Sequence, residues 1–411
     1  MTAWTSTAIA TAAAAAAERR PPMAGNLLIV HGGGPTAVIN SSLYGAIRQA
    51  QDCPLVDRVY AAIGGTGGLL NEKLRDVTDI PDAELRGLLS SPASAIGTSR
   101  DALEAPEYEA MVPILEKYGI RYVLMNGGNG TMDTCGKLYA RCAQRGINVI
   151  GIPKTMDNDL AITDHSPGFG SAARYMAGSV AEVCCDVEGL PIHIVVVEAL
   201  GRNAGWVTAA ASLATDSYAH GPDLIYLPER AFKEEEFLCD VEQLIKTKGH
   251  GVVVASEGLH YADGTPIVEP IFTVGRATYF GDVSAHLANL ITKKLGYKAR
   301  AEKPGILGRA SIAWQSETDR AEAELCGRAA VDAVTTGQSG KMVALRRVPG
   351  PKYRCETFLV DIQEVMMTER KMPEEFINAR GNNITEAFKE WCRPLIGGPL
   401  PKLMDLRPDQ K

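Results

Sequence analysis

Short apolar runs that end in glycine or in polar loops recur along the chain. They occur in seven segments: "NLLIVHGGG" (26–34), "DRVYAAIGGTGG" (57–68), "RYVLMNGGNG" (121–130), "INVIGIPKT" (147–155), "IHIVVVEALGR" (192–202), "DLIYLPE" (223–229) and "GVVVASEG" (251–258). Segments with helical spacing lie between them, such as Ile39, Leu43 and Ile47 after the first run. Continuous apolar strands that alternate with helices are typical of a parallel sheet covered on both faces. The pattern therefore predicts an α/β fold whose ligands bind beyond the carboxyl ends of the strands, where the glycine loops fall.

Length and composition favour an enzyme-sized protein of two domains. The chain has 411 residues, of which 45% are hydrophobic, enough to fill more than one core. Its formal net charge is −7, and its Lys and Arg residues are scattered instead of gathered into tracts. Nucleic-acid-binding proteins concentrate basic residues on one surface, so no nucleic-acid partner is expected.

The cysteines and the N-terminus indicate a cytoplasmic protein. Nine cysteines are dispersed, with no CxxC pair and no His-rich spacing suited to zinc, which is typical of reduced thiols in the cytosol. Residues 1–25 contain an alanine run that ends in Arg19-Arg20 and lack the basic start of a signal peptide. We therefore expect a disordered leader. No later stretch of about 18 apolar residues could span a bilayer, so no membrane partner is expected.

The first glycine loop, "GGGPTA" (32–37), admits two interpretations. It fits a permissive GxGxxA dinucleotide pattern, with Asp52 near the position of a ribose-binding acid, which would make the chain a nicotinamide-dependent oxidoreductase. The same glycines would also let backbone N–H groups approach any phosphate at the N-terminus of the following helix. The loop therefore predicts a phosphate site, and the nicotinamide alternative stays open.

Two further loops favour phosphoryl transfer. "GGNGTMDT" (127–134) offers flexible backbone donors, and Asn129 supplies an oxygen that can reach a metal or its water shell. It is not a Walker motif, because five residues separate Gly130 from Gly136. "PKTMDND" (153–159) sets a lysine, a threonine and two aspartates directly after an apolar run. A cation, a carboxylate base and a second carboxylate are the parts that magnesium-assisted phosphoryl transfer requires.

A longer series of motifs runs along the chain, in the order "GGGPTAVIN", "GGNGTMDT", "GIPKTMDNDL", "TDHSPGFGSAARY", "VVVEALGRNAGW", "DLIYLPE", "ASEG" and the tail "PEEFINARGNNITEAF". With these motifs in this order, over about residues 26–400, the chain resembles the phosphofructokinase family, and is most similar to the branch that includes pyrophosphate-dependent enzymes. The resemblance implies two Rossmann-like three-layer α/β domains with mainly parallel sheets. It also implies an Mg²⁺-dependent phosphotransferase that acts on the 1-hydroxyl of fructose 6-phosphate or a related sugar phosphate.

The resemblance further implies how the chain is divided. The phosphoryl-donor domain would comprise residues 26–169 and about 308–345, and the acceptor-sugar domain residues 170–307. Residues 346–411 would form a C-terminal extension that packs on both. Acceptor sites in this family draw arginines from neighbouring subunits, so we expect a homodimer or homotetramer with shared active sites, in which Arg300 acts across an interface.

The matching positions receive catalytic roles from the resemblance. Asp157 would act as the general base that takes the proton from the acceptor's 1-hydroxyl. Lys154 and Arg100 would neutralise the charge that develops on the transferred phosphoryl group. Thr155 would orient the acceptor.

Binding roles follow in the same way. Asp159, with Asn129 nearby, would hold Mg²⁺ directly or through water. The donor contacts would come from Gly33, Gly34, Thr36, Gly128, Asn129, Gly130 and Thr131. The acceptor contacts would come from Asp159, Gly201, Arg202, Glu257, Arg300, Arg309 and His193.

Departures from the family pattern bear on the acceptor. Members that use fructose 6-phosphate commonly surround its 6-phosphate with arginines and a histidine or tyrosine. Here Arg300 and Arg309 are present, whereas Ile306 occupies the histidine or tyrosine position and His193 stands where many members have a basic residue. Fewer charge-assisted contacts should weaken capture of a dianionic phosphate, so a different sugar phosphate, or a sugar lacking that phosphate, stays an alternative.

The donor and the activity itself also leave alternatives. Lys154 matches pyrophosphate-dependent relatives, and "GGGPTAVIN" resembles that branch, whereas Gly130 leaves room for the α-phosphate of a nucleotide. Pyrophosphate is therefore predicted, with ATP as the alternative donor. A catalytically inactive regulator of the same fold would be expected to lose at least one of Asp157, Asp159, Lys154 and Arg100, and all four are present.

Overall fold

The computed structural model describes residues 24–274, 277–366 and 368–407. Most of the expected leader, residues 1–23, lies outside these ranges. The chain divides into two compact units, each assembled from separate segments. The first unit comprises residues 1–155, 159–168 and 320–370, and the second comprises residues 156–158, 169–319 and 371–411.

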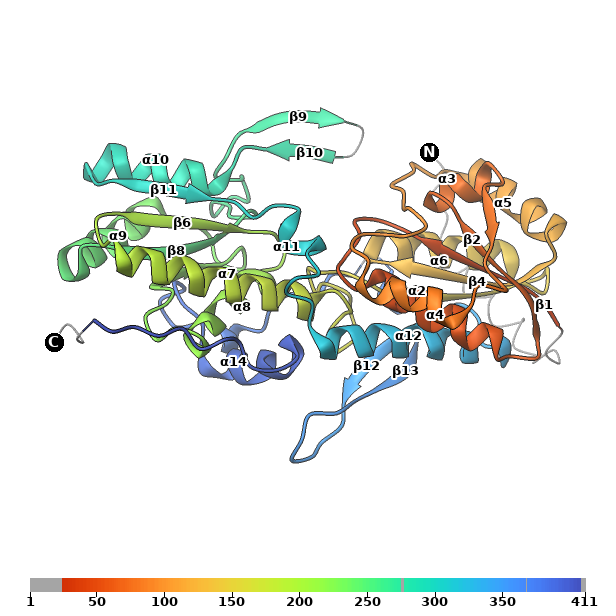
Figure 1. Ribbon diagram of the computed structural model, residues 1–411. Coiled ribbons are helices and arrows are strands. Elements are labelled where there is room, and N and C mark those ends of the chain that lie inside the picture. Colours follow the sequence, from red (N-terminus) through yellow and green to blue (C-terminus); the bar gives the residue numbers. More distant parts are fainter. Residues whose placement is uncertain (1–23, 275–276, 367, 408–411) are drawn as a thin grey trace. The chain divides into compact units, whose positions relative to one another are not determined.

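The first unit is built on a seven-stranded sheet with the order β13-β12-β5-β4-β1-β2-β3. Figure 1 labels β1, β2, β4, β12 and β13 among these strands. Its interior strands run parallel, and the two edge strands β3 and β13 pair antiparallel with their neighbours. The apolar run of β1 is buried on both faces, as the sequence pattern predicted. The strands are β1 Gly25–His31, β2 Val56–Ala62, β3 Leu74–Asp76, β4 Ile120–Gly127, β5 Asn148–Pro153, β12 Lys341–Arg347 and β13 Cys355–Asp361.

Helices cover both faces of this sheet because successive strand residues point to opposite sides. Leu27 and Ile29 of β1 pack in one core with residues of α2 and α12. Leu28 and Val30 pack in a second core with residues of α5 and α6. The helices of this unit are α2 Ile39–Gln51, α3 Gly65–Leu70, α4 Asp82–Leu85, α5 Ala105–Lys117, α6 Asn129–Cys142, α12 Glu317–Thr335, α13 Ile362–Val365 and the 3₁₀ helix η1 Arg86–Ser90.

The second unit contains an all-parallel four-stranded sheet with the order β11-β6-β8-β7. An antiparallel hairpin of β9 and β10 is separate from this sheet. Three of the parallel strands, β6, β7 and β8, coincide with apolar runs in the sequence. The strands are β6 Ile194–Ala199, β7 Leu224–Tyr226, β8 Gly251–Ser256, β9 Pro270–Val274, β10 Ala277–Phe280 and β11 Ala299–Glu302.

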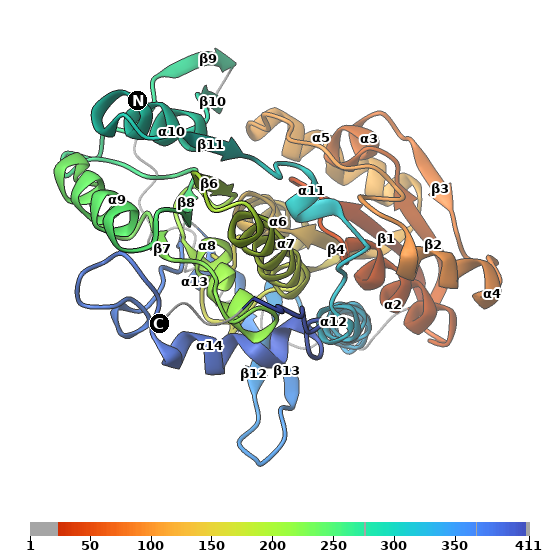
Figure 2. The same cartoon turned by 60° about the vertical axis from the view of Figure 1, so that its left-hand side comes forward.

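The parallel sheet of the second unit is also sandwiched between helices (Figure 2). Ile194 and Val196 of β6 share a core with Phe237 of α9 and with Val283 and Leu287 of α10. Helices α7 and α8 pack against the same strands. Both units are thus three-layer α/β structures, which confirms the predicted fold. The helices are α7 Phe169–Gly189, α8 Trp206–Ala210, α9 Glu234–Lys248, α10 Val283–Leu295, α11 Leu307–Ala310, α14 Glu386–Cys392 and the 3₁₀ helices η2 Ala211–Asp216, η3 Glu374–Phe376 and η4 Arg393–Ile396.

The division between the units differs from the expected one. The chain returns to the first unit at residue 320 instead of near residue 308, because the intervening segment packs on α7. A Cβ atom on Gly178 would lie 2.9 Å from the Trp314 ring, and Ser316 N donates to Ser171 Oγ at 3.1 Å. The C-terminal segment is likewise divided, with residues 346–370 in the first unit and 371–411 in the second.

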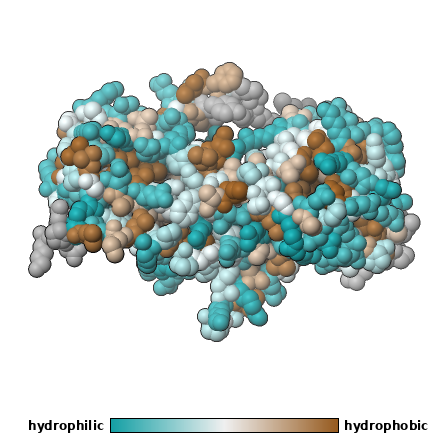
Figure 3. Space-filling view, viewed as in Figure 1, coloured by the Kyte–Doolittle hydropathy of each residue, from teal (hydrophilic) through white to brown (hydrophobic). Residues whose placement is uncertain are grey.

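The visible surface is mainly hydrophilic, and the cysteines are unpaired. Polar residues dominate the visible face, and hydrophobic residues lie in small scattered groups (Figure 3). Within the described residues, no helix is both long enough and apolar enough to cross a membrane. All nine cysteines are free thiols.

Candidate active site

The three loops that predict a phosphate and metal site follow adjacent strands of the first unit. They leave the carboxyl ends of β1, β4 and β5, which are neighbours in the sheet. Backbone hydrogen bonds join them, since Gly32 N donates to Asn126 O at 2.9 Å and Lys154 N donates to Gly127 O at 3.1 Å. The loops therefore form one surface at the edge where parallel α/β sheets bind ligands.

Glycine is required where the first two loops approach each other. A Cβ atom on Gly32 or on Gly127 would overlap the side chain of Thr131. Gly33 adopts φ +74°, a left-handed conformation that glycine tolerates without a Cβ penalty. Gly128 is the N-cap of α6, which begins at Asn129, so the backbone N–H groups of that helix end face this surface.

Lys154 places a positive charge beside the first loop. The side chain is 3% exposed, and its Nζ donates to Gly34 O at 2.6 Å. Its charge is also felt by His31 at the end of β1, a fully buried ring whose Nδ1 lies 2.8 Å from Ser94 Oγ. Burial, and then the Lys154 charge, lower the pKa of His31 to about 3. The Lys154 ammonium is thus held by a backbone carbonyl group, and its surroundings keep the neighbouring His31 ring neutral.

Arg100 is exposed and follows a segment bonded to the same loop. Gly33 N donates to Ser99 O at 3.0 Å, and Thr98 Oγ1 donates to Gly33 O at 2.8 Å. Arg100 therefore lies next to the first glycine loop, and its side chain is exposed to solvent. Sequence reasoning did not assign Thr98 or Ser99, although both belong to the "IGTSR" segment that contains Arg100.

Asn129 and Asp159, the two residues predicted to hold Mg²⁺, are in contact. Asn129 Nδ2 donates to Asp159 Oδ2 at 2.9 Å. Among the described residues, Asn129 Oδ1 and Asp159 Oδ1 are buried without a hydrogen-bond partner. Burial raises the pKa of Asp159, although a hydrogen bond from Thr155 opposes the shift. Two orphaned oxygens of an amide and a carboxylate suit a hard divalent cation such as Mg²⁺.

The remaining residues of the third loop are held by the backbone. Thr155 N donates to Pro167 O at 3.1 Å, and its side chain is 8% exposed. Asn158, between the two aspartates, is fully buried with φ +55°, a left-handed conformation that asparagine accepts better than most residues. This conformation turns the backbone sharply between Asp157, which is half-buried, and Asp159.

The two threonines predicted to bind the donor, and one glycine predicted with them, differ in their surroundings. Thr36 is 1% exposed, and its Oγ1 has no hydrogen-bond partner among the described residues. Thr131 is 8% exposed and separates the first two loops. Gly130, by contrast, has open space where a Cβ would stand, with no described atom within 4 Å.

Three predicted acceptor residues lie together in the second unit. Gly201 follows β6, and Glu257 follows β8, the adjacent strand. Gly201 N donates to Glu257 Oε1 at 3.1 Å, and burial raises the pKa of this carboxyl group. Arg202 is exposed, and its guanidinium lies 5.6 Å from the centre of the Phe280 ring. A carboxylate that accepts from backbone beside an exposed guanidinium can bind sugar hydroxyls and an anionic group.

Glu229 joins this region, although sequence reasoning did not single it out. It follows β7 in "DLIYLPE", and its Oε1 accepts from Gly205 N at 2.8 Å. Its Oε2 is buried without a partner among the described residues, and burial raises its pKa. The sequence offered one signal for Glu229, namely a carboxylate directly after an apolar strand.

The other acceptor candidates are not beside Gly201. His193 immediately precedes β6, whereas Gly201 lies beyond its opposite end. Arg300 is exposed on β11 and is paired with Val195, at the His193 end of the sheet. A strand of six residues spans about 20 Å, so His193 and Arg300 cannot contact the same small acceptor as Gly201 within one chain. The predicted acceptor set is therefore divided into two groups.

His193 itself is a buried histidine. It is 1% exposed, and its Nδ1 has no hydrogen-bond partner among the described residues. Burial, and then the Arg300 charge, lower its pKa. Arg309 is half-buried on the short helix α11, and its Nε lacks a partner among the described residues, whereas Ile306 beside it is 67% exposed.

The nicotinamide interpretation fails on the position of Asp52. A ribose-binding acid of a dinucleotide fold stands at the end of the second strand. Asp52 instead caps the C-terminus of α2, before β2 begins, and pairs with Arg48 at 3.5 Å. The first glycine loop therefore lacks its dinucleotide partner.

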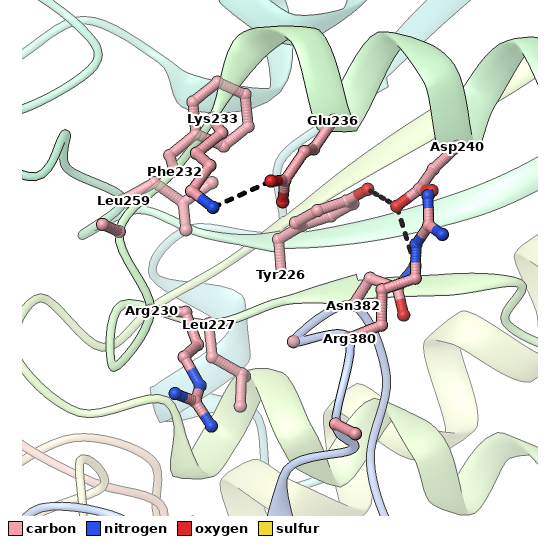
Figure 4. A pocket seen from close by; sticks show the side chains of 13 residues that line it. Tyr226, Leu227, Arg230, Phe232, Lys233, Glu236, Asp240, Leu259, Arg380 and Asn382 are labelled. Atoms are coloured by element: carbon pink, nitrogen blue, oxygen red, sulfur yellow. Dashed lines mark hydrogen bonds and ion pairs between the residues drawn. The ribbon is translucent and has the colours of Figure 1, made fainter.

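A cavity of about 310 Å³ lies elsewhere in the second unit (Figure 4). Tyr226 and Asn382 both bond Asp240 in its wall, and Lys233 pairs with Glu236 at 2.8 Å. None of the predicted site residues lines it. The charged side chains in its wall are paired. The cavity is therefore not part of the candidate site formed by the loops described above.

Comparison with known proteins decides the family. The sequence profile described as "Phosphofructokinase" matches residues 26–334. The chain belongs to the phosphofructokinase family. This confirms the resemblance that the motifs carry.

Individual members of the phosphofructokinase family cover nearly all of the chain. A pyrophosphate–fructose 6-phosphate 1-phosphotransferase from Xanthomonas campestris pv. campestris is 37% identical, over 89% of this chain and 90% of its own. A sulfofructose kinase from Alkalicoccus urumqiensis is 33% identical, over 89% and 94%. The crystal structure of a pyrophosphate-dependent phosphofructokinase from Nitrosospira multiformis matches with a TM-score of 0.84 and 35% identity, over 94% and 95%.

Proposed function

We propose that this phosphofructokinase-family chain transfers a phosphoryl group from inorganic pyrophosphate to the 1-hydroxyl of fructose 6-phosphate. The observation that carries the donor assignment is the buried Lys154, whose ammonium lies against the first glycine loop. A fixed ammonium beside backbone N–H groups suits a compact, highly charged donor. The pyrophosphate-dependent relatives, at 35% and 37% identity, support the same donor.

The residues of the three loops would share the chemistry. Asp157 takes the proton of the acceptor's 1-hydroxyl as that oxygen attacks the phosphorus. Lys154 and Arg100 stabilise the charge on the transferred group, and Thr155 orients the acceptor. Asn129 and Asp159 would hold Mg²⁺, which supplies charge neutralisation on the phosphate oxygens.

The acceptor would be held by Gly201, Arg202 and Glu257 of the second unit. Arg309 would add positive charge, and the exposed Arg300, with the buried His193 behind it, would serve the acceptor of a neighbouring copy in a homodimer or homotetramer. Their separation from Gly201 within one chain supports this arrangement. Free cysteines support a reducing compartment such as the cytoplasm.

Steady-state kinetics with Mg²⁺ and fructose 6-phosphate test the donor. The proposal predicts a much larger kcat/KM with pyrophosphate than with ATP. A larger value with ATP would overturn it. Gly130→Asp sharpens the test, because the open space at Gly130 would then be filled by a carboxylate. A pyrophosphate enzyme should tolerate this change, whereas an ATP enzyme should lose ATP use through like-charge repulsion.

A second candidate acceptor is sulfofructose, the substrate that the name of the Alkalicoccus urumqiensis relative gives. The exposed, apolar Ile306 favours it, since a sulfonate carries less charge than a phosphate and needs fewer cationic contacts. An acceptor panel separates the two candidates. Saturation at low micromolar fructose 6-phosphate, with no better acceptor, would exclude the second.

A further inference from the structure

Three side chains of different metal-binding types converge in the first unit, and none of them belongs to the three loops described above. His165 follows the third loop, Glu322 lies on α12, and Cys355 is the first residue of β13. One ligand atom from each lies within 4.8 Å of the others. The residues are far apart in the sequence, so the fold alone brings them together.

His165 is oriented as histidine ligands of metals commonly are. It is 1% exposed, and its Nδ1 lies 2.8 Å from Asp164 Oδ1. Asp164 is in turn fixed by Arg347, whose Nε donates to the same oxygen at 2.9 Å. A carboxylate on one ring nitrogen fixes the orientation of the imidazole and directs the other nitrogen, Nε2, to the ion.

Glu322 and Cys355 complete the cluster. Glu322 is 7% exposed, its Oε2 lies 2.6 Å from His165 Nε2, and its Oε1 accepts from Tyr353 Oη at 2.6 Å. Cys355 is half-buried, and its Sγ donates to Arg346 O at 3.2 Å. Cys355 therefore leaves the site open to solvent on one side, while the other two ligands are enclosed.

We propose that His165, Glu322 and Cys355 bind a zinc ion, with water in the fourth position. Nitrogen, oxygen and sulfur ligands in a tetrahedral arrangement suit Zn²⁺. The ion would tie the first residue of β13 to α12 and to the segment after the third loop. Because the hairpin of β12 and β13 projects from the sheet at this end (Figure 1), the ion would anchor the base of a projecting element.

The exchange of protons for the ion is balanced in charge. A ring that bonds a carboxylate through each nitrogen is protonated on both, because carboxylates only accept. Zinc replaces the proton on His165 Nε2 and the proton on Cys355 Sγ, and both protons pass to solvent. A dication thus replaces two protons, and the net charge of the buried cluster is unchanged.

The test is zinc binding to the full chain after chelator treatment. Titration with ZnCl₂, followed by calorimetry and metal analysis, should give one tightly bound ion per chain with release of protons. Cys355→Ser should weaken binding by at least ~10-fold, since even outer-sphere partners change metal affinity by about 10- to 100-fold. Cys53→Ser, at another half-buried cysteine of the same unit, is the matched control and should bind as the parent does.

A second measurement separates this cluster from the Asn129 and Asp159 pair. Cobalt substituted for zinc should show a thiolate-to-cobalt charge-transfer band that Cys355→Ser abolishes and Asp159→Asn retains. Circular dichroism confirms that each variant is folded. Absence of saturable binding overturns the proposal, as does binding that Asp159→Asn removes and Cys355→Ser leaves intact.

Discussion

The two units of this chain present their charged groups in opposite ways. In the first unit, Lys154 is buried and fixed against Gly34 O, beside glycine loops that leave no room for a side chain at Gly32 and Gly127. In the second, Arg202 is exposed and rests against the Phe280 ring, while Glu257 bonds the backbone at Gly201. A fixed charge stabilises a transition state without reorganisation, whereas an exposed guanidinium can adapt to its ligand. The comparison implies that the groups proposed to act on the phosphoryl group are held in fixed positions. The exposed groups proposed to bind the acceptor can move to fit different acceptors.

The largest effect should follow from Asp157→Asn. The two side chains are nearly isosteric, so the fold should remain, but kcat should fall by about 10² to 10⁴ on loss of the general base. The measurement is steady-state turnover with the preferred donor and acceptor, with thermal unfolding as the control. Near-normal turnover by a folded variant would remove Asp157 from this role.

Lys154→Met should have the next largest effect. Removing a preorganised charge that acts on the transition state costs about 10² to 10³ in kcat. Lys137→Met is the matched control, because Lys137 is an exposed partner of Asp133 on α6 of the same unit. Equal activities of the two variants would contradict the idea that the first unit carries the rigid charge.

Arg202→Met should act mainly on the acceptor. Loss of a charge-assisted contact of roughly 1.5 to 3 kcal/mol should raise the KM for the acceptor by about 10- to 100-fold, with a smaller change in kcat. The exposed Arg230, paired with Glu374 in the same unit, provides the control Arg230→Met. If Arg202→Met changed the donor KM instead, the assignment of acceptor binding to the second unit would be wrong.

The smallest effect concerns stability. In the folded chain, burial and then Lys154 lower the pKa of His31 to about 3, below its ordinary value of 6.5. The stability contributed by this neutral ring is fully present above pH 6.5 and is lost as pH falls toward 3. The slope is at most about 1.4 kcal/mol per pH unit.

Denaturant unfolding between pH 7 and pH 4.5 measures this dependence. His31→Asn, which does not titrate there, should show a shallower decline than the parent chain. His220→Asn, at an exposed histidine of the second unit, should decline as the parent does. Parallel curves for the parent and His31→Asn would show that the buried ring does not contribute.

Much of this protein follows from its sequence. The seven apolar runs coincide with β1, β2, β4, β5, β6, β7 and β8. Strands buried on both faces, such as β1, β4 and β6, must be almost continuously apolar. The glycine loops and "PKTMDND" predicted a phosphate and metal site, since turn glycines and clustered carboxylates are local features, and the fold brings these loops to one edge of the sheet. The family was evident from the order of these motifs.

Other features depended on tertiary structure. Strand β3 has three residues and β11 is mostly exposed, so neither produces a buried apolar run. The boundary at residue 320 depends on Trp314 and Ser316 packing against α7, which no local pattern announces.

The separation of His193 from Gly201 follows from the strand between them, whose two ends lie about 20 Å apart, although the binding roles taken from the resemblance grouped the two residues in one site. Conversely, His165, Glu322 and Cys355 are distant in the sequence and adjacent in space. Sequence determines local propensity and burial, and these specify which segments become strands and loops. Which side chains meet depends on strand order and on the contacts between distant segments, and only the folded chain decides these.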